Sequence, residues 1–188
     1  MVIVAVFASG SGTNFENIVK ANLQYANIKV LIVDKEKAYA IERAKKYNIP
    51  YIYVNPKAFP SKKEYELQIL EYLKEYEIEL IALAGYMRYI GEVLLESYGG
   101  RIINIHPAYL PNFPGAHGIK DAYDAKAKET GVTIHYVDEG VDTGEIIHQE
   151  KFEIDPSWTL EELEEKVHAL EYKMYPMVLE KLCKEGVR

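Results

Sequence analysis

Short apolar runs alternate with segments of helical periodicity over the first hundred residues. The run Val2–Phe7 is rich in β-branched residues and has the length of a buried strand. The same pattern predicts further strands at 28–33, 51–54, 79–84 and 101–105. Helices are predicted between them at 13–22, at 38–47 and after Ser61, which Glu64 follows at the spacing of a capping box. This alternation predicts right-handed crossovers and a mostly parallel sheet.

The pattern changes after residue 105. A proline-rich loop precedes a predicted helix near 117–126, and two strands, at 132–137 and 145–152, are joined by a hairpin-like connection. A long final helix has an apolar stripe at Leu160, Leu163, Val167, Leu170, Met174, Met177 and Val178. Pro176 is expected to bend or break this helix. The sequence predicts an open, mostly parallel, twisted α/β sheet with an antiparallel C-terminal addition and a long C-terminal helix.

Composition narrows the class of protein. The 188 residues fit one domain, taken as 1–188, and 22 Lys and Arg against 29 Asp and Glu give a net charge of −7. An acidic chain is a poor candidate for non-specific nucleic-acid binding. The single cysteine, Cys183, excludes an internal disulfide and a cysteine-based zinc site, and it suits a reducing compartment. No apolar run approaches the ~18 residues of a membrane span, so we expect a cytoplasmic protein without membrane contact.

A glycine-rich turn follows the first strand and opens the first helix. Unpaired N–H groups at a helix start attract anions, and glycines let a ligand approach the backbone closely. We therefore predict a site for a small phosphate monoester, built from Gly10, Ser11, Gly12, Thr13 and Asn14.

Other interpretations of this turn are weaker. The turn does not match a dinucleotide-binding fingerprint, because Phe15 occupies the position of the third glycine. Asp34 does lie at the spacing of a ribose-binding acid. The Gly-Lys end of a Walker A loop is absent, and Ser9 replaces the first glycine of a nucleophile elbow. A plain turn, in which Thr13 or Asn14 only caps the helix, remains open.

Two polar residues close the fifth strand. Asn104 and His106 are two positions apart, so their side chains share a face, and ligands bind outside the carboxyl ends of strands in open α/β sheets. Asp142 follows in a loop that ends at Gly144 and can pair with His106, favouring the imidazolium. An imidazolium beside an amide stabilises an oxyanion, and the carboxylate can take a proton from an attacking amine. These residues predict acyl transfer to an amine.

Three alternatives concern other histidines and the cysteine. Two or three of His106, His117, His135 and Asp142 could hold a metal, but no tight ligand spacing supports this, and no metal site is predicted. His148 lies in a strand and is interpreted as structural or exposed. Cys183 is interpreted as a packing residue.

The chain resembles the folate-dependent formyltransferases along nearly its whole length. The motifs that carry the resemblance are 8–14, Ala84-Gly85-Tyr86-Met87-Arg88, Asn104-Ile105-His106-Pro107, Leu110-Pro111, 113–117 and Asp138–Gly144. The family implies a Rossmann-like formyltransferase fold with a phosphate-binding half, 1–100, and a catalytic and folate-binding half, 101–188. It also implies that 10-formyltetrahydrofolate is a co-substrate, with no tightly bound cofactor, and that the amine of glycinamide ribonucleotide accepts the formyl group in purine biosynthesis.

The resemblance also implies roles for residues. Asn104 and His106 would stabilise the tetrahedral oxyanion, and Asp142 would position His106 and move a proton through water. Glu171, with His168 beside it, would meet the ribose. The folate would be held by Lys62, by Met87, Arg88, Tyr89 and Ile90, by Asn104, and by Val137, Asp138, Glu139, Gly140, Val141 and Asp142. Lys62 stands where relatives place an arginine, and it lacks the planar fork that binds a carboxylate with two hydrogen bonds.

Family members with other substrates are alternatives. A methionyl-tRNA formyltransferase is expected to need a further C-terminal domain and a basic face, and a formyltetrahydrofolate deformylase to carry an extra N-terminal domain. A phosphosugar-binding module without catalysis also remains open, and it would not require Asp142. The partners expected are small molecules, and the expected assembly is a monomer or a weak homodimer.

Overall fold

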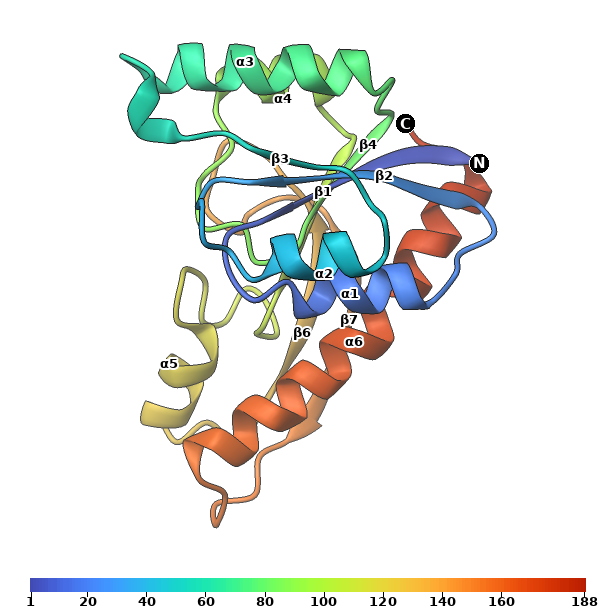
Figure 1. Ribbon diagram of the computed structural model, residues 1–188. Helices are drawn as coiled ribbons and strands as arrows, with labels where there is room; N and C mark the ends of the chain where they lie inside the picture. The colour runs from blue at the N-terminus through green and yellow to red at the C-terminus, as the bar shows by residue number, and fades with distance from the viewer.

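The computed structural model describes residues 1–188 and contains one seven-stranded sheet in the order β3-β2-β1-β4-β5-β6-β7 (Figure 1). The first five strands pair in parallel, and β6 pairs antiparallel with both β5 and β7. The strands are β1 Val2–Ala8, β2 Ala26–Val33, β3 Tyr51–Tyr53, β4 Leu80–Leu83, β5 Ile102–His106, β6 Glu129–Tyr136 and β7 Ile146–Glu153. The predicted fold class, including the antiparallel addition, is confirmed.

Helices cover both faces of the sheet. The helices are α1 Thr13–Lys20, α2 Ala40–Lys46, α3 Lys62–Glu75, α4 Glu92–Tyr98, α5 Gly118–Asp124 and α6 Leu160–Glu185, with a short 3₁₀ helix at Pro56–Ala58. In Figure 1, α3 and α4 lie on one side of the strands, and α1, α2 and α6 lie on the other. Each side therefore has its own hydrophobic cluster, and the central strands are buried on both faces.

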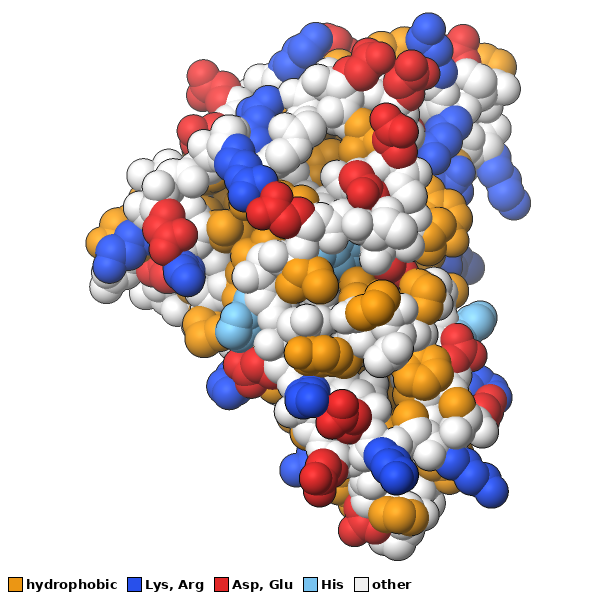
Figure 2. Space-filling view, turned by 180° about the vertical axis from the view of Figure 1, so that it is seen from behind, with side chains coloured by type: hydrophobic (Ala, Val, Ile, Leu, Met, Phe, Trp, Pro, Cys, Tyr) orange, Lys and Arg blue, Asp and Glu red, His pale blue; other side chains and the backbone are white.

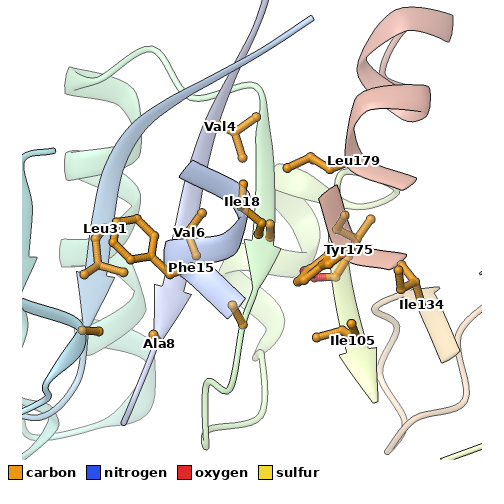
Figure 3. Packing of buried hydrophobic residues seen from close by; sticks show 14 of the residues in the cluster. Val4, Val6, Ala8, Phe15, Ile18, Leu31, Ile105, Ile134, Tyr175 and Leu179 are labelled. Carbon is orange, nitrogen blue, oxygen red and sulfur yellow. The ribbon is translucent and has the colours of Figure 1, made fainter. Parts of the chain in front are cut away.

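The larger cluster joins α1 and α6 to the sheet. Figure 3 shows Phe15 and Ile18 of α1 against Val6 of β1, and Tyr175 of α6 beside Ile105 and Ile134. These side chains are almost wholly excluded from solvent. Burial of this kind contributes roughly 1.5–3 kcal/mol for each large apolar side chain, so the two helices are fixed by packing.

Helix α6 differs from its prediction in two respects. It continues through Pro176, so the proline does not break the helix. Tyr175, Val178 and Leu179 are buried on either side of the proline, and their packing outweighs the hydrogen bond that proline removes. Met177, which was placed in the apolar stripe, is 46% exposed.

Helix α4 was not predicted from the sequence. Its N-cap is Gly91, which has no side chain to bond the first turn. Glu66 of α3 supplies the missing acceptor, because its buried carboxylate accepts the Leu94 N–H at 3.3 Å. A cap provided by a distant residue leaves no local signal in the sequence.

The strand order reverses between β1 and β4. From β1 the chain builds outward to β2 and β3, and it then crosses to β4 and β5 on the other side. Ligands of open α/β sheets bind at the carboxyl ends of the strands at such a reversal. The glycine-rich turn after β1, the segment after β4 and the polar end of β5 all lie at this edge.

Replacement of Tyr175 by Phe is expected to lower the free energy of unfolding by about 1–2 kcal/mol. The hydroxyl of the fully buried Tyr175 donates to the carbonyl oxygen of Leu83 at 2.7 Å, which ties α6 to β4. Urea unfolding measures the change, with Tyr39→Phe as the control because Tyr39 is 59% exposed. Equal stability of the two variants would contradict this account.

Candidate active site

One cavity of about 620 Å³ opens at the carboxyl ends of the central strands. Every residue that was predicted for the site from the sequence lines it, from the glycine-rich turn to Glu171. Residues that line the cavity but were not predicted for it include Lys35, Tyr86 and His135. In Figure 2, hydrophobic side chains gather across the middle of one face of the molecule, next to histidine, and charges of both signs surround them. The structure brings the predicted residues together, and their individual roles stay predictions.

Asn104, His106 and Asp142 meet inside the cavity. Asn104 and His106 come from the end of β5, where their shared face is directed to the cavity, as the two-residue spacing predicts. Nδ1 of His106 lies 3.5 Å from Oδ2 of Asp142. His106 is 4% exposed and Asp142 is 13% exposed at the side chain, so this pair is largely screened from water.

His135 is a fourth member of this group that was not predicted for the site. Its Nε2 lies 3.4 Å from Nδ2 of Asn104 and 3.6 Å from Oδ1 of Asp142. Its Nδ1 lies 2.8 Å from the carbonyl oxygen of Tyr136, which can only accept, so Nδ1 carries a hydrogen. His135 therefore presents Nε2 to both neighbours. The sequence places His135 in a predicted strand, but it does not give the register in which this strand pairs with β5. Without that register, His135 could not be placed beside Asn104.

Asp142 is held as a carboxylate. Burial alone would raise its pKa, but the neighbouring His135 ring, the hydrogen bond from the Gly115 N–H and the charge of His106 hold the pKa below its ordinary value. The Gly115 N–H donates to Oδ2 at 2.7 Å. Asp142 also has a φ of 53°, in the left-handed region that few non-glycine residues adopt. These contacts stabilise a backbone conformation that aims the side chain at the two histidines.

The second nitrogen of His106 is also engaged. Nε2 lies 2.8 Å from the carbonyl oxygen of Phe113, so this nitrogen carries a hydrogen. Phe113 has a φ of 54°, which is uncommon for a bulky residue and directs its carbonyl toward the ring. His106 is thus clamped between Asp142 and the loop that follows β5.

The glycine-rich turn has the geometry of an anion site. Gly12 is the N-cap of α1, with a φ of 73°, and no side chain caps the helix, so the plain capping interpretation of Thr13 or Asn14 is wrong. A Cβ at Gly12 would lie 2.5 Å from the Cβ of Ala40, so both the conformation and the space require glycine. The buried Oδ1 of Asn14 has no hydrogen-bond partner within the protein. Because no side chain caps α1, its first-turn N–H groups remain available to a ligand.

The predicted folate segments border the same cavity. Met87 and Tyr89 are more than 60% exposed, at 64% and 66%, and present apolar surface at the opening. In the loop 138–144, Oδ1 of Asp138 accepts from the Gly140 N–H at 2.9 Å and from the Thr143 hydroxyl at 2.7 Å. Asp138 therefore shapes the loop through its side chain.

Two cations predicted for the folate also line the cavity. Lys62 is the first residue of α3, and Arg88 follows β4. The Arg88 guanidinium lies 5.3 Å from the ring centroid of Tyr65, whose hydroxyl is 2.8 Å from that of Tyr86. Stacking on Tyr65 restricts Arg88, whereas Lys62 is exposed at the end of its helix.

Glu171 and His168 form a pair on α6. Nδ1 of His168 lies 2.7 Å from Oε2 of Glu171, and Glu171 is 5% exposed. The hydrogen bond to Glu171 raises the pKa of His168 above its ordinary value of 6.5, and partial burial opposes this rise. A buried acceptor is thus placed at the cavity wall with the His168 ring beside it.

The alternative sites gain no support from the structure. No group of three or more histidine, cysteine, aspartate or glutamate residues is arranged to hold a metal ion. Asp34 is buried and does not line the cavity, and His117 is exposed outside it. His148 lies on β7 with a side chain that is 40% exposed. Burial raises the pKa of Cys183 to about 12, so its thiol is poorly suited to nucleophilic chemistry.

Comparison with known proteins identifies relatives along nearly the whole chain. A family model described as formyl transferase matches residues 2–179. The phosphoribosylglycinamide formyltransferase of Bacillus subtilis (strain 168) is 51% identical over 181 residues, which cover 95% of this chain and 93% of that protein. The crystal structure of glycinamide ribonucleotide transformylase 1 from Geobacillus kaustophilus has a TM-score of 0.95 and 50% identity, covering 97% of this chain and 99% of that chain. The trifunctional purine biosynthetic protein adenosine-3 of Drosophila pseudoobscura pseudoobscura is 40% identical over 98% of this chain, but the match spans only 14% of that longer protein.

Replacement of His168 by Gln is expected to destabilise the protein more at low pH than at high pH. Because the pKa of His168 is raised on folding, its stabilising contribution is fully present below the ordinary value of 6.5 and is lost as the pH rises through the folded value. Urea unfolding at about pH 5.5 and about pH 8.5 measures the difference. Glu165→Gln, an exposed change on the same helix, is the control. A loss of stability for His168→Gln that is the same at both pH values would refute this interpretation.

Proposed function

The chain belongs to the formyl transferase family, and from this premise we propose that it transfers the formyl group of 10-formyltetrahydrofolate to the amine of glycinamide ribonucleotide. The products are formylglycinamide ribonucleotide and tetrahydrofolate, in de novo purine biosynthesis. The observation that carries the proposal is the meeting of Asn104, His106 and Asp142 on the cavity that the glycine-rich turn also lines. The folate is a co-substrate, and no tightly bound cofactor takes part.

The reaction begins when the amine nitrogen attacks the formyl carbon. A bond forms between these two atoms, and the carbonyl electrons move to the oxygen, which becomes an oxyanion. The amide of Asn104 and the ring of His106 are donors of the kind that stabilise such an oxyanion. In the structure Nε2 of His106 donates to the carbonyl of Phe113, so donation to the substrate requires that this hydrogen bond be shared or exchanged.

Collapse of the tetrahedral intermediate completes the transfer. The bond between the formyl carbon and N10 of the folate breaks, N10 takes up a proton, and the former amine loses one. Asp142 is the proposed proton acceptor because its lowered pKa keeps it a carboxylate at neutral pH, and because it lies beside both His106 and His135. The same contacts keep His106 in its orientation while the charge on the substrate changes.

Binding is divided among several elements. We assign the phosphate to the first-turn N–H groups at Gly10–Asn14, and the ribose hydroxyls to Glu171 with His168 beside it. The folate is assigned to Met87–Ile90, to the loop 137–142 and to the cations Lys62 and Arg88. Residues from 1–100 and from 101–188 line the same cavity, which supports a single catalytic unit built from both halves.

The proposal also covers the partners, the assembly and the location of the enzyme. The partners are small molecules, in keeping with the family, and we propose a monomer or a weak homodimer. No helix is both long and apolar enough to cross a membrane. A cytoplasmic location is proposed because the one thiol, Cys183, is free and buried.

A formyl-transfer assay tests the proposal directly. Purified protein is mixed with glycinamide ribonucleotide and 10-formyltetrahydrofolate, and the formation of tetrahydrofolate and formylated product is followed. Turnover that depends on the amine is the expected result. Folded protein without turnover would refute the proposal, and release of formate without the amine would indicate a hydrolase.

Replacement of Asn104 or His106 by Ala is expected to lower kcat by about 10²–10³, because each change removes an oxyanion donor. Steady-state kinetics at saturating substrates measure the loss. His148→Ala is the matched control, because His148 is a histidine of the same sheet that does not line the cavity. Near-normal kcat in both site variants would contradict the assigned roles.

A further inference from the structure

A side chain outside the cavity holds the phosphate loop, residues 10–14. Arg43 lies on α2 and does not line the cavity. Its Nε donates to the carbonyl oxygen of Ser11 at 2.7 Å, and its Nη1 donates to the carboxylate of Glu16. The guanidinium also lies 5.0 Å from the ring centroid of Tyr39. Arg43 therefore links the loop to both helices that pack beside it.

The contacts with α2 fix two peptide units of the loop. The carbonyl of Gly10 accepts the Ala40 N–H at 3.1 Å, and the carbonyl of Ser11 accepts from Arg43. In a trans peptide unit the C=O and N–H groups point in opposite directions. The N–H groups of Ser11 and Gly12, which share these two units, are therefore directed away from α2. Neither donates a hydrogen bond within the protein, and both residues line the cavity.

We propose that Arg43 is a positioning residue for the phosphate group of the substrate. By holding the Ser11 carbonyl, it fixes the orientation of the Gly12 N–H before the ligand arrives. This inference rests on the proposed function for the identity of the phosphate ester. Arg43 contributes no direct contact, because it lies behind the loop.

Glu16 keeps the guanidinium in place. The side chain is nine-tenths buried, and it also accepts from the Tyr47 hydroxyl at 3.0 Å and lies 3.4 Å from Nζ of Lys46. Burial alone would raise the pKa of Glu16, but the Tyr47 hydrogen bond and the charges of Arg43 and Lys20 hold it below its ordinary value. The carboxylate is thus charged at neutral pH and forms a fixed anchor for Arg43.

A substitution at Glu16 distinguishes two ways in which Arg43 could assist phosphate binding, by orienting the loop or by attracting the phosphate charge. If Arg43 acted only through its positive charge, removal of the negative charge of Glu16 would leave the positive charge of Arg43 less neutralised. Phosphate binding would then become stronger. If Arg43 acts by orienting the loop, loss of its anchor weakens phosphate binding. Glu16→Gln therefore has opposite effects under the two mechanisms.

The experiment is a comparison of steady-state kinetics with direct binding. Arg43→Met is expected to raise KM for glycinamide ribonucleotide by about 10- to 100-fold, with kcat and KM for the folate within about twofold of wild type. Glu16→Gln is expected to raise the same KM by about 3- to 10-fold. Arg43→Lys is expected to lie between wild type and Arg43→Met, because one ammonium replaces a fork that reaches two acceptors.

Lys46→Met is the matched control. Like Arg43→Met, it removes a cation of α2 that lies beside Glu16. Unlike Arg43, Lys46 makes no contact with the loop. Its KM for glycinamide ribonucleotide is expected to stay within about twofold of wild type. An unchanged KM in Arg43→Met, or a lower KM in Glu16→Gln, overturns the inference.

Calorimetric titration with ribose 5-phosphate separates this inference from the proposed function. If wild type shows no formyl transfer but binds ribose 5-phosphate more tightly than Arg43→Lys and Glu16→Gln, the proposed function fails and the positioning role stands. If formyl transfer is normal and all variants bind ribose 5-phosphate equally, the positioning role fails and the function stands. Absence of binding to wild type overturns the positioning role. The two conservative variants keep the test decisive if Arg43→Met does not fold.

Discussion

The antiparallel register of β5 and β6 is the constraint on which the candidate chemistry depends. Asn104 is paired with His135, and His106 with Thr133. Directly opposite residues in an antiparallel pair project to the same face, so all four side chains share one side of the sheet. Thr133 also accepts from the Leu110 N–H at 3.1 Å and donates to the Ala108 carbonyl at 2.8 Å, which anchors the loop after β5. A one-residue slip of β6 would turn His135 and Thr133 to the opposite face of the sheet, away from Asn104 and His106.

Local groups, and not the total charge, account for how an acidic protein can bind two anionic substrates. The net charge is −7, yet Lys35, Lys62 and Arg88 all line the cavity, and the phosphate loop offers N–H groups. Charges beyond roughly 8–10 Å are screened at physiological ionic strength, so distant carboxylates contribute little inside the site. The negative total charge therefore disfavours a nucleic-acid partner. The N–H groups and cations that line the cavity decide which small anion binds.

The fold, the glycine-rich turn and the pair Asn104 and His106 could be predicted because their signals are local, whereas the folate segments and Glu171 were implied by the family resemblance. Strand runs, helix periodicity and the spacing of Asn104 and His106 can each be recognised within a few residues. What could not be predicted depends on contacts between distant segments. His135 required the β5–β6 register, and α4 required Glu66 as a remote cap. Arg43 resembles an ordinary exposed cation of an amphipathic helix until α2 is placed against the phosphate loop.

Two residues in uncommon backbone conformations meet at His106. Asp142 and Phe113, with φ values of 53° and 54°, place a carboxylate and a carbonyl against opposite nitrogens of the same ring. Such conformations are unfavourable in isolation and persist where surrounding contacts determine them. The β5–β6 register, the Gly115 N–H and the loop anchor at Thr133 supply those contacts. The fold therefore fixes the orientation of His106 before any substrate binds, and preorganised groups of this kind need little rearrangement as charge develops in a transition state.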